Sequence, residues 1–82
     1  AVIGVDGVDP QAGCTVYDQL GGRTAKALLR RARRAVVLAD GSKFGKVALT
    51  QACALSDVDV LITDSSADTA VLDAISTRTV VV

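Results

Sequence analysis

The chain has 82 residues, half of them hydrophobic, and its nine basic and nine acidic residues give a formal net charge of zero. A chain of this length forms at most one small domain, and its balanced charge gives no general attraction to nucleic acid or to a membrane surface. It contains no His and no Glu, so the commonest metal ligand and the commonest general base are absent.

Cys14 and Cys53 are the two cysteines, and they are too far apart in the sequence to form a C-x-x-C motif. Two thiols without a disulfide framework are typical of a reducing compartment. We expect them to be buried structural thiols. We expect no signal peptide, because no positively charged segment precedes an apolar one, and the apolar runs are too short to span a bilayer. These features predict a cytoplasmic protein without a membrane partner.

Four short apolar runs rich in β-branched residues predict strands that are buried on both faces of a sheet. They are Ala1–Asp6, Ala35–Asp40, Val58–Asp64 and Arg78–Val82.

Three segments between these runs predict helices: Asp18–Arg34, Phe44–Leu55 and Ala67–Ile75. The resulting order, β-α-β-α-β-α-β, predicts a Rossmann-like α/β fold with a parallel sheet and crossover helices. Three helices do not cover both faces of a four-stranded parallel sheet. We therefore expect the chain to be a fragment of a larger domain, or to use an extensive partner interface.

Three of the predicted strands end in an aspartate that is followed by Gly or Ser. These ends are Asp6-Gly7, Asp40-Gly41-Ser42 and Asp64-Ser65-Ser66. Ligands of open α/β sheets bind outside the carboxyl ends of the strands, where Lys43 would add positive charge. Asp and Ser are also common helix caps, and capping of the third helix accounts for the last of these ends without any ligand.

Two other stretches permit more than one interpretation. Gly4–Gly13 contains Pro10 and predicts an irregular loop, in which Asp6 and Asp9 could hold a metal ion or accept hydrogen bonds from sugar hydroxyls. Two carboxylates alone form a weak metal site, so no metal is assigned. The basic run Arg30–Arg34 could contact nucleic acid, but we prefer to interpret it as a solvated helix face, because no aromatic residue lies nearby to stack on bases.

The stretches "IGVDGVDPQAGCT", "LADGSKFGKVAL" and "LSDVDVLITD", in this order and spacing, resemble the C-terminal effector domain of DeoR-type bacterial transcription regulators. The resemblance runs from Ala1 to about Asp64. It implies that residues 1–82 are the C-terminal part of a sugar-phosphate-binding effector domain, and that a helix-turn-helix DNA-binding domain lies outside this chain.

The resemblance also implies a fold similar to that of ribose-5-phosphate isomerase A, glucosamine-6-phosphate deaminase and CoA transferases. It implies a phosphorylated sugar or related metabolite as the ligand, whose binding modulates DNA binding, most often in a repressor. The family's lysine falls on Lys43, within the turn that includes Asp40 and Ser42, and its strand-end acid and glycine fall on Asp6 and Gly7. We expect these five residues to bind the ligand, no cofactor, and a homo-oligomer.

The chain departs from the family at Gly21-Gly22, where Glu-Ala is common. Two adjacent glycines weaken a helix start, so the first helix could begin only at Arg23. An isomerase or deaminase remains an alternative, because "DGVD" and "DGSK" resemble segments of ribose-5-phosphate isomerase. However, proton transfer between sugar carbons needs a positioned base, and the chain has no Glu. A non-catalytic oligomerisation module is the second alternative.

Overall fold

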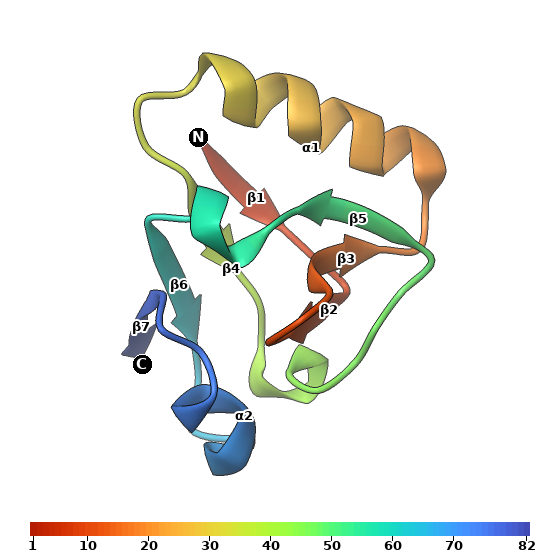
Figure 1. Ribbon diagram of the computed structural model, residues 1–82. Helices are drawn as coiled ribbons and strands as arrows, with labels where there is room; N and C mark the ends of the chain where they lie inside the picture. Colours follow the sequence, from red (N-terminus) through yellow and green to blue (C-terminus); the bar gives the residue numbers. More distant parts are fainter.

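The four predicted strands form one parallel sheet. A computed structural model describes all 82 residues, 1–82, and places the strands in the order β1-β4-β6-β7 (Figure 1). Their bounds are Val2–Gly4 for β1, Val36–Leu38 for β4, Val60–Thr63 for β6 and Arg78–Val81 for β7. In the register, Val37 pairs with both Ile3 and Leu61. The α/β class with a parallel sheet is therefore confirmed.

A second sheet, which is antiparallel, was not predicted. It contains β2 (Gly7–Asp9), β3 (Gly13–Val16) and β5 (Thr50–Cys53), in the order β2-β3-β5. The prediction of an irregular loop over Gly4–Gly13 is wrong, because most of this stretch belongs to the β2–β3 hairpin. The carboxylate of Asp9 closes the hairpin turn by accepting the backbone N–H groups of Gln11 at 2.9 Å and Ala12 at 2.8 Å.

The predicted helix Phe44–Leu55 is also wrong, so the order β-α-β-α-β-α-β does not hold between β4 and β6. Phe44 forms a parallel bridge with Val8, and the N–H of Gly45 donates to the carbonyl of Val8 at 2.8 Å. The chain then runs extended into β5, which pairs with β3. Hydrogen bonds to the hairpin outweigh the helix propensity of the alanines, which is a weak preference.

Helix α1 spans Gln19–Arg31, and the carboxylate of Asp18 caps it by accepting the N–H of Leu20 at 3.0 Å. The adjacent glycines suggested that the helix could begin only at Arg23, but it begins at Gln19 and includes both of them. Gly22 is buried, and a Cβ at this position would lie 2.8 Å from the Cγ2 atom of Thr50. The missing side chain therefore lets α1 pack closely on β5.

Helix α2 is shorter than predicted and spans Thr69–Asp73. Its cap is Asp68, whose carboxylate accepts the N–H groups of Ala70 at 2.8 Å and Val71 at 3.3 Å. The prediction that Asp64, Ser65 or Ser66 caps this helix is therefore wrong. Asp64 and Ser66 instead form hydrogen bonds with each other in the turn after β6.

The hydrophobic core lies between the two sheets. Leu61 and Val37 of the parallel sheet and Val8 and Cys14 of the hairpin are its largest fully buried side chains. Both cysteines are buried and free, as expected. No helix of the structure has the length and apolarity needed to span a bilayer.

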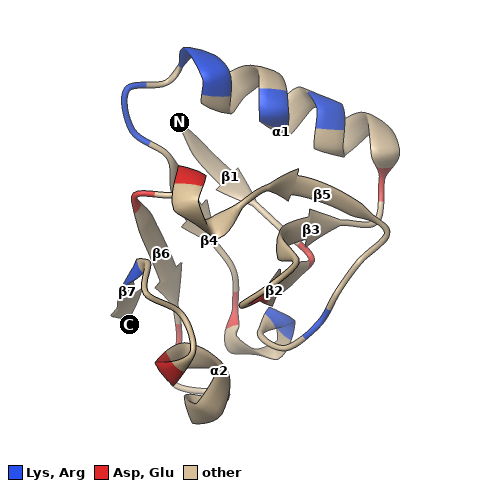
Figure 2. Cartoon of the chain, viewed as in Figure 1, with Lys and Arg blue, Asp and Glu red and all other residues tan.

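The opposite face of the parallel sheet is left uncovered. Side chains on this face include Val2, Leu38 and Val80, which are 63%, 45% and 37% exposed. This agrees with the expectation that the chain alone cannot cover both faces. Most of the basic residues lie along α1 and in the loop that follows it (Figure 2), where residues 30, 31, 33 and 34 are all exposed, whereas Arg78 on β7 lies on the same face as Val80.

Candidate functional site at the carboxyl edge of the parallel sheet

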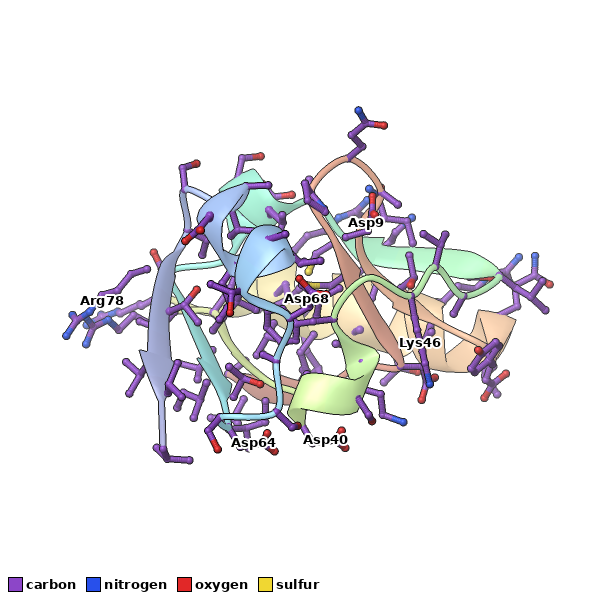
Figure 3. The ribbon with its side chains drawn as sticks, turned by 90° about the horizontal axis from the view of Figure 1, so that it is seen from below. Asp9, Asp40, Lys46, Asp64, Asp68 and Arg78 are labelled. Atoms are coloured by element: carbon purple, nitrogen blue, oxygen red, sulfur yellow. The ribbon has the colours of Figure 1, made fainter.

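The carboxyl ends of the parallel strands lie along one edge of the sheet, and an aspartate follows three of them. Asp6 comes after β1, Asp40 after β4 and Asp64 after β6. The last two lie next to each other in Figure 3 and line one pocket. This is the edge at which α/β sheets bind ligands.

The turn after β4 is built around Asp40. Its Oδ1 atom accepts the N–H of Ser42 at 2.9 Å and also the Ser42 hydroxyl, and it caps the short 3₁₀ helix η1 (Gly41–Lys43). These hydrogen bonds from Ser42, with a smaller contribution from the charge of Lys43, lower the pKa of Asp40 below its usual value. The carboxylate is therefore ionised throughout the physiological range.

The turn after β6 repeats this arrangement around Asp64. Its Oδ1 atom accepts the hydroxyl and the N–H of Ser66, the latter at 2.8 Å, and the N–H of Gly41 at 3.3 Å. These bonds lower the pKa of Asp64 in the same way. In both turns the hydrogen bonds use Oδ1, so Oδ2 of each carboxylate is left for other partners.

Gly41 holds the two turns together. A Cβ at this position would lie 2.2 Å from the N atom of Ala67 and 2.4 Å from the carbonyl carbon of Ser66. No larger residue fits without moving backbone. The two turns therefore form one packed unit, and the Gly41–Asp64 hydrogen bond crosses the contact between them.

A shallow pocket of about 190 Å³ lies between these strand ends. It is lined by Leu38, Ala39, Asp40, Ile62, Thr63, Asp64 and Val82. Asp40 is thus the predicted site residue that reaches the pocket, and Asp64 joins it. Ser42 is exposed, and Lys43 is half-buried on the neighbouring turn, where its charge acts on Asp40.

Sequence reasoning missed Thr63, the last residue of β6. It lines the pocket, is 3% exposed, and its Oγ1 atom is buried without a hydrogen-bond partner. Thr63 lies two positions after the buried Leu61, so it is on the same, core-facing side of the strand.

Asp6 and Gly7 lie apart from this pocket. The Oδ2 atom of Asp6 accepts the N–H of Tyr17 at 3.0 Å, and the backbone N–H of Asp6 donates to the carbonyl of Thr15 at 2.9 Å. Gly7 is buried, and a Cβ there would lie 2.4 Å from the carbonyl oxygen of Lys46. Both residues hold the hairpin against the rest of the chain, and their contact with a ligand remains a prediction.

No group of three or more metal-ligating side chains gathers anywhere in the structure. Asp9, considered with Asp6 as a metal ligand, uses its carboxylate in the hairpin turn.

Comparisons with known proteins match the same stretch of chain. Residues 1–65 match the family model of the DeoR C terminal sensor domain. The HTH-type transcriptional repressor GlcR of Bacillus subtilis (strain 168) is 34% identical over 64 residues, which cover 78% of this chain and 24% of that protein.

The glycerol-3-phosphate regulon repressor of Escherichia coli (strain K12) is 27% identical over 75 residues, which cover 92% of this chain and 30% of that protein. The protein of the same name from Shigella flexneri matches equally. The chain therefore spans less than a third of the length of these curated relatives. The family match extends over most of the chain, from β1 to the end of β6 and the turn after it. This chain belongs to the DeoR C-terminal sensor domain family.

Proposed function

We propose that the chain is the metabolite-sensing part of a bacterial transcription repressor, and that it binds a phosphorylated sugar or related metabolite at the carboxyl edge of its parallel sheet. The observation that carries the proposal is the pocket between Asp40 and Asp64, whose lining residues other than Val82 lie inside the stretch that matches the sensor family. The relatives GlcR and the glycerol-3-phosphate regulon repressor are both repressors, which supports the regulatory role.

Lys43 is the residue proposed to hold the phosphate. It lies in η1, directly after the Asp40–Ser42 turn, and it is half-buried, so a bound anion would gain from a partly desolvated charge. The exposed Ser42 could donate a further hydrogen bond. Asp6 and Gly7 would take part through the hairpin that they position, since their own polar groups are used within the chain.

Ligand binding would alter DNA binding by favouring one conformation of the sensor. The DNA contacts belong to another part of the intact protein, and residues 1–82 are proposed as the C-terminal part of its effector domain. A cytoplasmic homo-oligomer without a cofactor completes the proposal. The cytoplasmic location follows from the proposed role, because a bacterial repressor acts on the chromosome. The homo-oligomer is supported by the uncovered apolar face of the sheet, which would suit a subunit or domain interface.

A thermal-shift screen of the intact protein tests ligand binding. The probes are ribose 5-phosphate, fructose 1-phosphate, glucose 6-phosphate and glycerol 3-phosphate. At least one of them should raise the melting temperature in a concentration-dependent way, because a ligand that binds only the folded state stabilises it. The absence of a shift with every probe would contradict the proposal.

Catalysis is not part of the proposed function, because the chain supplies neither His nor Glu as a base. The intact protein should not isomerise ribose 5-phosphate above the uncatalysed rate. Turnover that disappears in an Asp6→Asn variant would overturn this part of the proposal and favour the isomerase alternative.

A further inference from the structure

Helix α1 and the loop that follows it carry most of the positive charge of the protein (Figure 2). Six of the nine basic residues lie between residues 23 and 34, and all six are exposed: Arg23, Lys26, Arg30, Arg31, Arg33 and Arg34. No acidic residue interrupts this segment, since the nearest ones in the sequence are Asp18 and Asp40. The chain as a whole has no net charge, so its positive charge is concentrated on one surface, which we call the α1 basic face.

The packing of α1 turns this face outward. Gly22 and Ala25 are the buried residues of the helix and Leu29 packs against the core, so the inner side of α1 lies on β3 and β5. Arg23 and Arg30 are two turns apart and share one outer side of the helix. The distance between their positions along the helix axis is about 10 Å, and duplex DNA presents about six phosphate charges over that length.

Solvation alone is a poor explanation for a face of one sign, because solvated protein surfaces usually mix both signs of charge. Lys26 and Arg30 are i,i+4 neighbours of like charge, which destabilises a helix. The helix dipole favours Arg30 and Arg31 in the last turn, but it gives no such benefit to Arg23. Asp57 lines a pocket with Lys26 and Arg30, and a single carboxylate leaves most of the face uncompensated. A partner with repeated negative charge would remove this repulsion.

Duplex DNA is the partner that fits the α1 basic face. The absence of a nearby aromatic side chain argues against stacking on the bases of a single strand. A duplex, in contrast, is held mainly through its phosphates, which need only basic side chains. The relatives are repressors, and GlcR is an HTH-type one. In such a protein another domain holds the DNA, so a duplex would already be tethered near the sensor part.

We propose that the α1 basic face contacts the phosphate backbone of the DNA that the intact repressor holds, and that it adds affinity without sequence preference. The inference rests on the proposed function and goes beyond it, because it gives the sensor part a contact with DNA of its own. None of the six basic residues lines the pocket between Asp40 and Asp64. Their replacement should therefore leave the binding of sugar phosphates unchanged.

The test measures binding of the intact protein to two duplexes of unrelated random sequence, by fluorescence anisotropy over a series of KCl concentrations. The variant Arg23→Gln/Arg30→Gln should bind both duplexes more weakly than the wild type and to the same extent, because phosphate contacts carry no sequence information. The plot of log affinity against log salt concentration should become shallower by about 0.9 for each phosphate contact that is lost, or by about 1.8 in all. Glutamine has a helix propensity close to that of arginine, so the melting temperature should not fall.

The variant Lys46→Gln/Arg78→Gln is the matched control. It removes the same amount of charge from two exposed positions outside the α1 basic face, and it should keep the salt dependence of the wild type. The thermal shift that sugar phosphates produce in the wild type should be unchanged in Arg23→Gln/Arg30→Gln, which shows that the variant is folded and still senses its ligand.

The possible results are distinct. If both double variants lose the same affinity and slope, the effect reflects net charge alone and this inference is wrong. It is also wrong if neither variant changes the slope, and the proposed sensing of sugar phosphates stands in both cases. If the wild type binds neither duplex, the proposed repressor role and this inference are both overturned.

Discussion

Cys14 lies directly opposite Cys53 in the pairing of β3 with β5, and both thiols are free. A hydrogen bond from the Cys14 thiol lowers the pKa of Cys53. Cys53 also lines a surface pocket of about 270 Å³, together with Lys26, Arg30 and Asp57. Burial and the negative charge of Asp57 oppose the lowering of the Cys53 pKa. Of the two thiols, Cys53 nevertheless has the lower pKa, because the hydrogen bond to Cys53 and burial raise the pKa of Cys14.

We predict that hydrogen peroxide joins the two cysteines. Peroxide would oxidise the Cys53 thiolate to a sulfenic acid with release of hydroxide, and the Cys14 thiol would then displace water to form the disulfide. The intact mass should fall by two hydrogens, and reaction with a thiol reagent in denaturant should show both thiols lost. The Cys14→Ser variant should form no such bond. Two free thiols after treatment of the folded wild type would contradict the prediction.

Gly41→Ala should destabilise the protein, because its Cβ would collide with the backbone of Ser66 and Ala67. We expect a loss of about 1–3 kcal/mol in the free energy of unfolding, the usual range for overpacking, measured by urea denaturation. Gly4→Ala is the control. Its Cβ would meet nothing nearer than the carbonyl oxygen of Leu38 at 3.9 Å. Equal stability of the two variants would show that the turns after β4 and β6 are not packed as described.

Stability should decline in acid through Asp40 and Asp64. Each has a folded-state pKa below the usual value of 3.8. Their contribution is therefore complete above about pH 3.8 and is lost as the pH falls through the lowered folded-state pKa. Since the serine hydroxyls are the main cause of the shifts, the double variant Ser42→Ala/Ser66→Ala should show a smaller acid-induced loss in urea midpoint.

The control for this measurement is Ser76→Ala, because Ser76 is exposed and lies outside both turns. It should reproduce the pH profile of the wild type. A double variant whose acid slope also matches the wild type would show that the serine hydroxyls do not stabilise the two carboxylates.

Lys43→Ala should weaken binding of the phosphorylated probes by about 1.5–3 kcal/mol, the range for a charge-assisted hydrogen bond. Calorimetric titration of the intact protein measures this change. Lys46→Ala, which removes an exposed lysine three positions further along the chain, should have little effect. Unchanged affinity in a folded Lys43→Ala variant would remove Lys43 from the site.

The 82-residue chain by itself should associate in solution, because one face of its parallel sheet exposes apolar side chains. Sedimentation velocity should detect species larger than the monomer. The variant Val2→Thr/Val80→Thr, which alters that face, should reduce association. Leu49→Thr, which alters an 84% exposed side chain in the loop before β5, should not. A monodisperse wild type with a cooperative melt would show that the exposed face is tolerated in water.

The strands of the parallel sheet could be predicted because each is a continuous β-branched run, a local pattern that survives in the fold. The strand β5 could not, because it pairs with β3, which lies far away in the sequence. The β2–β3 hairpin is a local pairing, but its short strands, GVD and GCTV, contain no continuous apolar run. The local sequence "VALTQACAL" does not predict that the N–H of Ala48 donates to the Thr15 hydroxyl at 2.8 Å. The alanines favoured a helix only in the absence of that partner.

The candidate site was predictable to the same extent. The Asp40–Lys43 turn stands out in the sequence because a lysine follows a glycine and a serine at a strand end. The proximity of Asp64 to Asp40 depends on the β4–β6 pairing, and the burial of the Thr63 hydroxyl without a hydrogen-bond partner depends on what packs around β6. Neither is encoded in a short motif.

The chain crosses between its two sheets several times: it leaves β1 for the hairpin, returns in β4, leaves again for β5 and returns in β6. The strands of the two sheets therefore alternate along the chain: β4 lies between β3 and β5, and β5 lies between β4 and β6. Neither sheet can be completed alone, so the search for native pairings is long-range and slow for a chain of this size. Once formed, the strands should open together, and backbone amides of β3 and β6 should exchange with deuterium at similar, globally limited rates.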